Sequence, residues 1–168
     1  PDFETYKKII SDLFLNSEYK LNFEPGRSLI AEAGILVTKV IRNKKNKDKN
    51  FIVIDVAMNN LIRPTLYDAY HKIEPVKKIP GKEIIADIVG PICETGDFIA
   101  LNRKITEVNN NDKLIIRTTG AYASVMKSNY NARVDAVEIL IYNGKSYKLK
   151  KTDTILDTIS KEKIVEFI

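Results

Sequence analysis

The chain has 168 residues, of which 44% are apolar, and a formal net charge of +5 at neutral pH. This length supplies one ordinary domain, or one domain with a piece of a second, and the apolar content suffices for a core. The single cysteine excludes an intramolecular disulfide framework, and no apolar run approaches the roughly 20 residues of a membrane span. We therefore expect a soluble, cytoplasmic protein without a secretory signal.

The first elements expected are a helix and a strand. Apolar residues recur at three- and four-residue spacing over residues 3–15, which predicts an amphipathic helix facing an apolar surface, and a strand should follow at residues 19–25. We interpret this pair as the last elements of a preceding α/β unit. The chain also begins at Pro1 without an initiator methionine, which favours a piece of a longer protein.

Strand patterns dominate the rest of the sequence. They occupy residues 34–42, 51–56, 83–92, 97–105, 113–120 and 136–149. The last run contains Asn143-Gly144, which predicts a type I′ hairpin. A short turn or helix is expected after Pro64, and a closing helix after a cap at Thr152 or Asp153. This order predicts an α+β fold, mainly β, with a closed β-barrel or sandwich as its body.

A dense lysine cluster lies at residues 42–50. Basic clusters are one signature of nucleic-acid binding, but this one lies between two apolar runs and has no interleaved aromatic residues. We interpret it as a solvent-exposed hairpin loop and expect no nucleic-acid partner.

The first candidate site is the sequence EPGR at residues 24–27. Pro25 restricts the backbone, Gly26 allows a ligand to approach it, and Arg27 can bind a carboxylate or phosphate with two parallel hydrogen bonds. Glu24 ends the expected strand, where α/β folds place their ligands. Taken alone, this stretch is better interpreted as a Pro-Gly turn with a surface ion pair.

Arg63 and Tyr67 form the second candidate. They are four residues apart around Pro64, so both side chains point the same way if the segment is helical, and together they suit a carboxylate. Without context, a capping arginine and a core tyrosine are favoured. The only histidine, His71, ends an apolar run and is interpreted as structural, and we expect no metal site.

The third candidate is the pair Cys93-Glu94. A free cysteine is most often a small buried hydrophobe. However, Pro91 precedes the pair and residues 95–97 read Thr-Gly-Asp, which predicts a turn with exposed side chains.

The fourth candidate is the loop at residues 118–134. Tyr122 follows two small residues there, and a phenol beside a flexible backbone suits a phosphate or an aromatic ring. By composition alone, this segment is merely a loop.

In this order, the motifs resemble one known family. EPGR (24–27), MNNLIRPTLY (58–67), CETGD (93–97) and GAYASVMKSNYN (120–131) are similar to the C-terminal part of the diaminopimelate decarboxylases. These are pyridoxal 5'-phosphate enzymes of the alanine racemase and ornithine decarboxylase fold type, and the resemblance covers nearly the whole chain. It implies conversion of meso-diaminopimelate to L-lysine and CO2, the last step of lysine biosynthesis, by a homodimer with shared sites.

The resemblance also implies how the chain is divided. Residues 1–32 would be the terminal helix and strand of a (β/α)8 barrel that binds the cofactor, 33–150 the C-terminal β-barrel domain, and 151–168 a closing helical segment. The Schiff-base lysine, the glycine-rich phosphate loop and the histidine that stacks on the ring belong to the barrel, and nothing in this chain matches them. The chain alone is therefore expected to be inactive.

The resemblance assigns five residues to the cofactor. Glu24 would pair with the pyridinium nitrogen and so keep the ring able to accept electrons. Pro25, Gly26 and Arg27 would contact the cofactor, and Tyr122 would touch both cofactor and substrate. Arg27 would also contact the substrate.

The remaining roles concern the substrate. Arg63 and Tyr67 would hold the carboxylate remote from the reaction. Cys93 would donate the proton that replaces CO2, and Glu94 would bind the distal ammonium group, both delivered from the partner subunit. A thiol titrates close enough to neutrality to give up a proton, and a carboxylate complements an ammonium ion.

Two positions depart from the family pattern, because Thr95 stands where serine is usual and Asn60 where aspartate is usual. Neither changes a group with an assigned role. Two alternatives remain: a decarboxylase of another basic amino acid (ornithine, arginine or lysine) on the same fold, and a non-catalytic relic β-domain. The pair Arg63 and Tyr67 favours a substrate with a distal carboxylate. An alanine racemase would not need Glu94 and Arg63 for a long zwitterionic tail.

Overall fold

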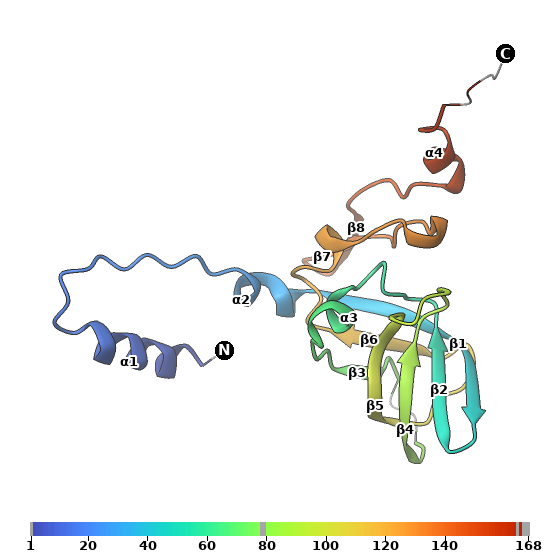
Figure 1. The fold of residues 1–168 in the computed structure, drawn as a ribbon, viewed down its shortest axis with the longest axis horizontal. Coiled ribbons are helices and arrows are strands. Elements are labelled where there is room, and N and C mark those ends of the chain that lie inside the picture. Colours follow the sequence, from blue (N-terminus) through green and yellow to red (C-terminus); the bar gives the residue numbers. More distant parts are fainter. Residues whose placement is uncertain (1, 78–79, 164, 166–168) are drawn as a thin grey trace.

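The computed structural model describes residues 2–77, 80–163 and 165. Figure 1 shows a body of β-strands with an arm at each end. One arm carries helix α1 (Phe3–Phe14), which an extended segment separates from the body. The other arm carries the hairpin of β7 (Ile139–Tyr142) and β8 (Lys145–Lys148), followed by helix α4 (Ile155–Ile159).

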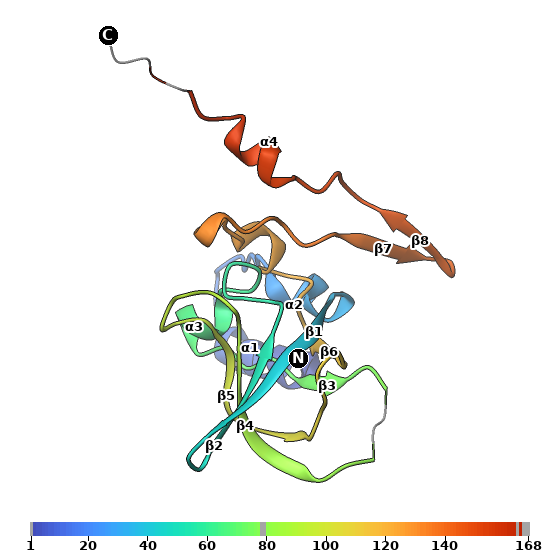
Figure 2. The same cartoon turned by 90° about the vertical axis from the view of Figure 1, so that its right-hand side faces the viewer.

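The body is a six-stranded sheet in the order β3-β6-β1-β2-β4-β5. Its strands are β1 (Ile35–Asn46), β2 (Lys49–Ile54), β3 (Ile73–Pro75), β4 (Glu83–Val89), β5 (Phe98–Thr106) and β6 (Lys113–Arg117). All neighbours pair antiparallel except β2 and β4, which are parallel. The edge strands β3 and β5 are in contact, so the sheet curls into a nearly closed barrel (Figure 2). The expected α+β fold with a barrel-like body is confirmed.

Side chains that alternate along the strands fill the barrel. In β2, Ile52 and Ile54 are buried, whereas their neighbours Phe51 and Val53 are only partly buried. This period of two is that of a sheet with one face on the core. Residues from five of the strands and from the adjacent loops complete the same cluster: Val40, Leu61, Ile73, Ile88, Ile99, Val108, Leu114 and Ile116.

Short helices lie in the segments before and between the strands. They are α2 (Arg27–Ile30), α3 (Arg63–Tyr67) and three single 3₁₀ turns, η1 (Ala31–Ala33), η2 (Ser124–Met126) and η3 (Tyr130–Ala132). As expected, a helix forms around Pro64, which occupies its first turn, where a missing N–H costs nothing. Asp68 ends it in the left-handed region with φ of 51°.

Both predicted hairpins form. The lysine-rich residues 42–50 continue β1 into β2, with Asn46 paired to Lys49, and nearly all of them are exposed. In the second hairpin, Asn143 and Gly144 both have positive φ, at 48° and 71°, which is the signature of a type I′ turn.

Two predictions about the arms are wrong. Residues 19–25 run extended but form no strand, because no strand among the described residues lies beside them to share hydrogen bonds. The cap of α4 is Thr154 rather than Thr152 or Asp153. Its hydroxyl accepts from the N–H of Asp157 (3.1 Å), whose carboxylate accepts from the N–H of Thr154 (2.7 Å). Residues 164 and 166–168 of the expected closing helix lie outside the described part.

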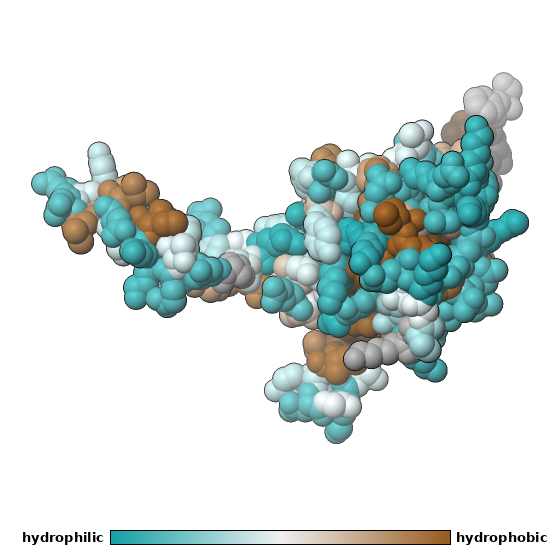
Figure 3. All heavy atoms as spheres, turned by 90° about the horizontal axis from the view of Figure 1, so that it is seen from below, coloured by the Kyte–Doolittle hydropathy of each residue, from teal (hydrophilic) through white to brown (hydrophobic). Residues whose placement is uncertain are grey.

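No helix in the described ranges is long and apolar enough to cross a membrane. The arms nevertheless expose much apolar surface, and Figure 3 shows apolar side chains along the arm that carries α1. None of the residues of α1 is buried.

Candidate functional site

Two glycines join the EPGR segment to the loop that carries Tyr122. The N–H of Thr119 donates to the carbonyl of Gly34 (3.0 Å), and the N–H of Gly120 donates to that of Ala31 (2.9 Å). A Cβ on Gly120 would lie 2.1 Å from the carbonyl oxygen of Ile30, and one on Gly34 would lie 2.3 Å from the Cα of Gly120. Only glycine lets the two backbones approach so closely.

The junction brings Gly26 against Tyr122. A Cβ on Gly26 would lie 2.6 Å from the phenol oxygen of Tyr122, whose backbone is left-handed with φ of 59°. Arg27 is half-buried, and its Nε has no hydrogen-bond partner within the described residues. Glu24 and Pro25 are exposed. The ion pairs of the described residues include none with Glu24 or Arg27, so the surface ion pair of the simpler interpretation is not observed there.

Arg63 lies close to two phenol rings. Its guanidinium carbon is 5.5 Å from the ring centroid of Tyr67 and 5.9 Å from that of Tyr122. The predicted shared direction of Arg63 and Tyr67 is therefore observed, and Tyr67 is 58% exposed rather than a core residue. The Nε of Arg63 is buried without a partner in the described residues, so this guanidinium keeps capacity to bind an anion.

His71 lies fully buried close to these arginines. Its Nδ1 is 2.9 Å from the carbonyl oxygen of Arg117, and its buried Nε2 has no partner within the described chain. Burial lowers the pKa of His71, and the positive charges of Arg27, Arg63 and Arg103 lower it further. The ring is therefore neutral at pH 7, with the proton on Nδ1 and a lone pair on Nε2. The sequence indicated only a structural histidine and gave no sign of these charges.

Cys93 and Glu94 lie on an exposed turn, as predicted, so Cys93 is not a buried filler. The turn is closed by backbone hydrogen bonds from the N–H of Gly90 to the carbonyl of Asp97 (3.0 Å) and from the N–H of Asp97 to that of Glu94 (3.1 Å). The carboxylate of Glu94 also accepts from the N–H of Gly96 (3.2 Å).

Side chains connect this turn to the other candidate segments. The hydroxyl of Thr65, in α3, donates to the carbonyl of Gly96 (2.5 Å). Glu94 also lines a shallow hollow with Met58, Ser128 and Tyr130. Residues from three of the four sequence motifs, at 58–67, 93–97 and 120–131, therefore meet around this turn.

Two buried polar residues, Asn59 and Asp97, hold these loops, and neither was expected to have a role. Asn59 and Ser128 exchange two hydrogen bonds, of 3.0 and 3.2 Å, which attach the loop at residues 120–131 to the segment before Arg63. The carboxylate of Asp97 accepts from two backbone N–H groups. Both residues lie inside the sequence motifs, and this position could have indicated their role. A polar residue that lies within a motif but has no assigned ligand contact is a candidate for holding the loops in place.

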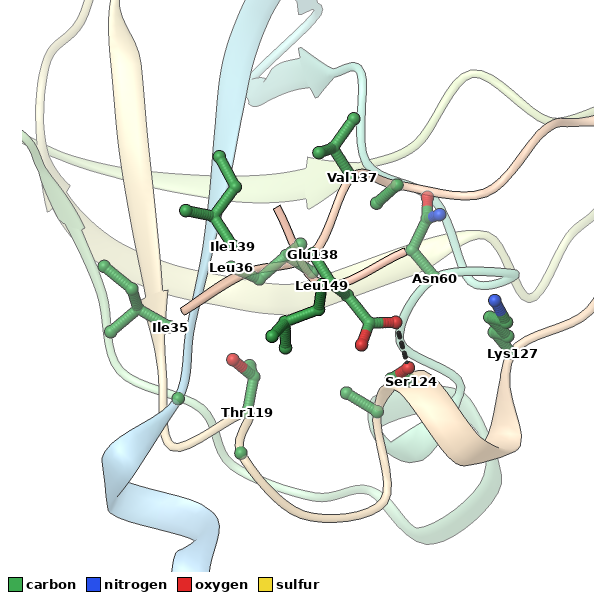
Figure 4. Close-up of a pocket in the computed structure, with 14 residues that line it drawn as sticks. Ile35, Leu36, Asn60, Thr119, Ser124, Lys127, Val137, Glu138, Ile139 and Leu149 are labelled. Atoms are coloured by element: carbon green, nitrogen blue, oxygen red, sulfur yellow. Dashed lines mark hydrogen bonds between the residues drawn. The ribbon is translucent and has the colours of Figure 1, made fainter. Parts of the chain in front are cut away.

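A separate hollow lies between the sheet and the β7–β8 arm (Figure 4). Apolar side chains line it, among them Ile35, Leu36 and Ile139. At its rim, hydrogen bonds from Lys150 and from the hydroxyl of Ser124 hold the pKa of Glu138 below its usual value. None of the predicted site residues lines this hollow, and the described residues contain no group of three acidic, histidine or cysteine side chains suited to a metal ion.

Comparison with known proteins identifies the family to which the chain belongs. The sequence profile of the family described as "Pyridoxal-dependent decarboxylase, C-terminal sheet domain" matches residues 9–120. A diaminopimelate decarboxylase of Zymomonas mobilis is 44% identical over the whole chain, and one of Aquifex aeolicus is 47% identical over 86% of it. The chain spans 40% and 34% of the lengths of these relatives.

A solved structure of similar fold is that of the diaminopimelate decarboxylase of Helicobacter pylori complexed with L-lysine. It superposes with a TM-score of 0.83 and 33% identity over 96% of this chain and 40% of its own. The similarity thus extends through the sheet and most of both arms.

Proposed function

Because the chain belongs to the family of pyridoxal-dependent decarboxylases, as its C-terminal sheet domain, we propose that it is part of an enzyme that converts meso-diaminopimelate to L-lysine and CO2. The proposed enzyme is a cytoplasmic homodimer. In it, residues 1–32 end a cofactor-binding barrel, residues 33–150 form the sheet domain, and residues 151–168 close the chain. The relatives named above, all diaminopimelate decarboxylases, support the choice of substrate.

The observation that carries the proposal is the position of Arg63. A guanidinium close to two phenols, with a buried Nε that has no partner in the described residues, is suited to a carboxylate held in two-point contact. Diaminopimelate carries a carboxylate at the end remote from the reaction, whereas ornithine and lysine do not. We therefore assign Arg63 and Tyr67 to the distal carboxylate.

The residues present fit pyridoxal phosphate. Gly26 leaves no room for a side chain beside the Tyr122 phenol, and the buried Nε of the adjacent Arg27 lacks a partner in the described chain. This segment therefore offers close backbone approach and a guanidinium donor, which suit an anionic ring compound. When bound, the cofactor supplies an electron-accepting ring for the electrons of the broken bond. Glu24 would keep the ring nitrogen protonated, and Pro25 would shape the turn.

Two residues would act on the substrate from the exposed turn. Cys93 would give its thiol proton to the carbon that loses CO2, and Glu94 would bind the distal ammonium group. Both side chains are exposed, which supports delivery to a site on the partner subunit. Arg27 and Tyr122 would complete the substrate contacts.

The test uses the proposed full-length protein with pyridoxal phosphate and meso-diaminopimelate, measuring CO2 and lysine. Cys93→Ala should lower kcat by about a hundredfold or more, as expected for loss of a proton donor, with a smaller change in KM. Arg63→Ala should raise KM by about tenfold or more. Lys44→Ala, in the exposed β1–β2 hairpin, is the control and should leave both unchanged. Equal activity of Cys93→Ala and wild type would remove the assigned role of the thiol.

A further inference from the structure

Asp97 is a buried ionisable residue to which the proposed chemistry gives no task. Only 4% of its surface is exposed. It ends the CETGD motif, four residues after Cys93, at the point where the exposed turn rejoins the sheet at β5. Burial of a carboxylate is costly unless its oxygens are fully hydrogen-bonded, so its contacts indicate what it does.

Each oxygen of this carboxylate accepts one backbone N–H from a different segment. The N–H of Ile92 donates to Oδ2 (2.6 Å), which fixes the start of the turn, and the N–H of Met58 donates to Oδ1 (2.7 Å). Met58 belongs to the segment that leads into Arg63. One side chain therefore joins the turn to a loop 39 residues away in the sequence.

Gly90 completes this arrangement from the other side. A Cβ at this position would lie 2.4 Å from both carboxylate oxygens of Asp97. Glycine is thus required for the carboxylate to sit between the two segments. The hydroxyl of Thr65 adds a parallel connection by donating to the carbonyl of Gly96 (2.5 Å).

We propose that Asp97 is a positioning residue, which fixes the turn carrying Cys93 and Glu94 against the segment that precedes Arg63. The inference rests on the proposed function for its catalytic consequence, because in the proposed homodimer the turn reaches the partner's site. Asp97 sets how this turn projects from its own subunit. Without it, the turn loses its direct connection to the 56–60 segment, and the thiol is presented less often in the orientation for proton transfer.

The test compares Asp97→Asn with Asp87→Asn in the full-length protein. Asparagine keeps the size of Asp97 but places an NH2 group opposite one of the two N–H donors, so that one hydrogen bond is lost. Asp87, which is equally buried in β4, accepts from the N–H of Asn102 (2.8 Å) and pairs with Lys49, away from both loops. Hydrogen exchange is followed by mass spectrometry alongside kcat and KM.

In Asp97→Asn, exchange should rise by about tenfold in residues 56–60 and 90–97 together, the factor expected for one charge-assisted hydrogen bond, while β6 remains protected. Turnover should fall by a similar factor. Asp87→Asn should change exchange only around its own contacts. If Asp97→Asn folds poorly, Gly90→Ala replaces it in the test. This substitution displaces the Asp97 carboxylate without removing it, and it should raise exchange in the same two segments.

Three results would overturn the proposal: faster exchange spread evenly over the sheet, faster exchange in residues 90–97 alone, or loosened loops with wild-type turnover. If the wild-type protein fails to decarboxylate diaminopimelate, the proposed function is wrong. The exchange data still decide whether Asp97 joins the two segments.

Discussion

At the scale of single residues, the candidate site is a cluster of cations around a neutral ring. Arg27, Arg63 and Arg103 all act on His71, and Arg103 additionally donates to the His71 carbonyl (2.7 Å) and lies over the Tyr70 ring. Such a cluster repels further positive charge and attracts anions. A protonated His71 would add a fourth charge in a buried position, which the fold resists.

This environment predicts a pH dependence of stability. The pKa of His71 is lowered from its ordinary value of 6.5, so below about pH 6.5 the unfolded chain binds a proton that the folded chain does not. The free energy of unfolding should therefore fall as pH drops from about 6.5 toward the folded pKa, by up to about 1.4 kcal/mol per pH unit. His71→Asn, which retains a donor for the Arg117 carbonyl, should remove this part of the dependence. Urea unfolding of both proteins between pH 5 and 8 measures it, and identical pH profiles would contradict the assignment.

Two glycines of the site should respond differently to substitution by alanine. Gly120→Ala places a methyl group against backbone atoms that cannot move, so it should destabilise the protein by about 1–3 kcal/mol. Gly26→Ala meets only the end of the Tyr122 side chain, which can shift, so its cost in stability should be below about 1 kcal/mol. Gly26→Ala should instead weaken cofactor binding, because Tyr122 is displaced. Thermal unfolding measures the stability of both variants, and cofactor titration measures their affinity for the cofactor. If the two variants changed stability equally and cofactor affinity equally, this geometry would be contradicted.

Local sequence patterns predicted part of this site. The spacing of Arg63 and Tyr67 around Pro64 was sufficient to place their side chains together, because helical geometry alone decides it. The contact of Arg63 with Tyr122 was not predictable from local pattern, since 59 residues separate the two and the glycine junction sets their distance. Asp97 was missed for the same reason: its partner Met58 lies in another segment.

At the scale of elements, strands were predicted well and the arms less well. Alternating apolar residues decide a strand when one face meets a core, as in β2 and β6. Residues 19–25 carry a strand-like pattern, but a strand also needs a neighbouring strand, and the described residues offer none. The α4 cap was misplaced by one or two residues, because Thr152, Asp153 and Thr154 are all acceptable caps and only the reciprocal bond with Asp157 selects one.

In the β7–β8 hairpin, the conformational preference of the turn can be tested separately from side-chain packing. No heavy atom lies within 4 Å of a Cβ placed on Gly144, so Gly144→Ala changes only the cost of a left-handed backbone at φ of 71°. That cost is about 1 kcal/mol, and hydrogen exchange in the ladder of residues 139–148 should speed up about fivefold. Ser146→Ala, on the same exposed hairpin, is the control. Unchanged exchange in Gly144→Ala would contradict a type I′ turn.

The apolar side of α1 predicts an interface. Phe3, Tyr6 and Leu13 are 61%, 51% and 70% exposed, and apolar surface of this kind is normally covered. If residues 1–32 end a barrel, as proposed, Leu13→Ala should destabilise the full-length protein by about 2–3 kcal/mol. Lys8→Ala, on the opposite side of the helix, should change stability by less than about 0.5 kcal/mol. Chemical denaturation compares them, and equal small effects would argue against burial of this face.

At the scale of the whole molecule, the sheet acts as a platform for loops that are distant in sequence. Hydrogen bonds between backbones, glycines without side chains and two buried polar residues bring three motifs to one side of a nearly closed barrel, and the EPGR turn joins them through Tyr122. A rigid platform with functional residues on its loops is a common way to hold a site in place. The barrel-like body was predictable, because it needs only strand patterns and their order.

We propose that this platform belongs to a decarboxylase selective for a substrate with a distal carboxylate. The most direct measurement is CO2 release by the full-length protein with pyridoxal phosphate, comparing meso-diaminopimelate, L-lysine and L-ornithine as substrates. We predict that kcat/KM for diaminopimelate exceeds the other two by at least about a hundredfold, and that Arg63→Ala removes most of this preference. Equal or faster turnover of lysine or ornithine by the wild-type protein would contradict this assignment.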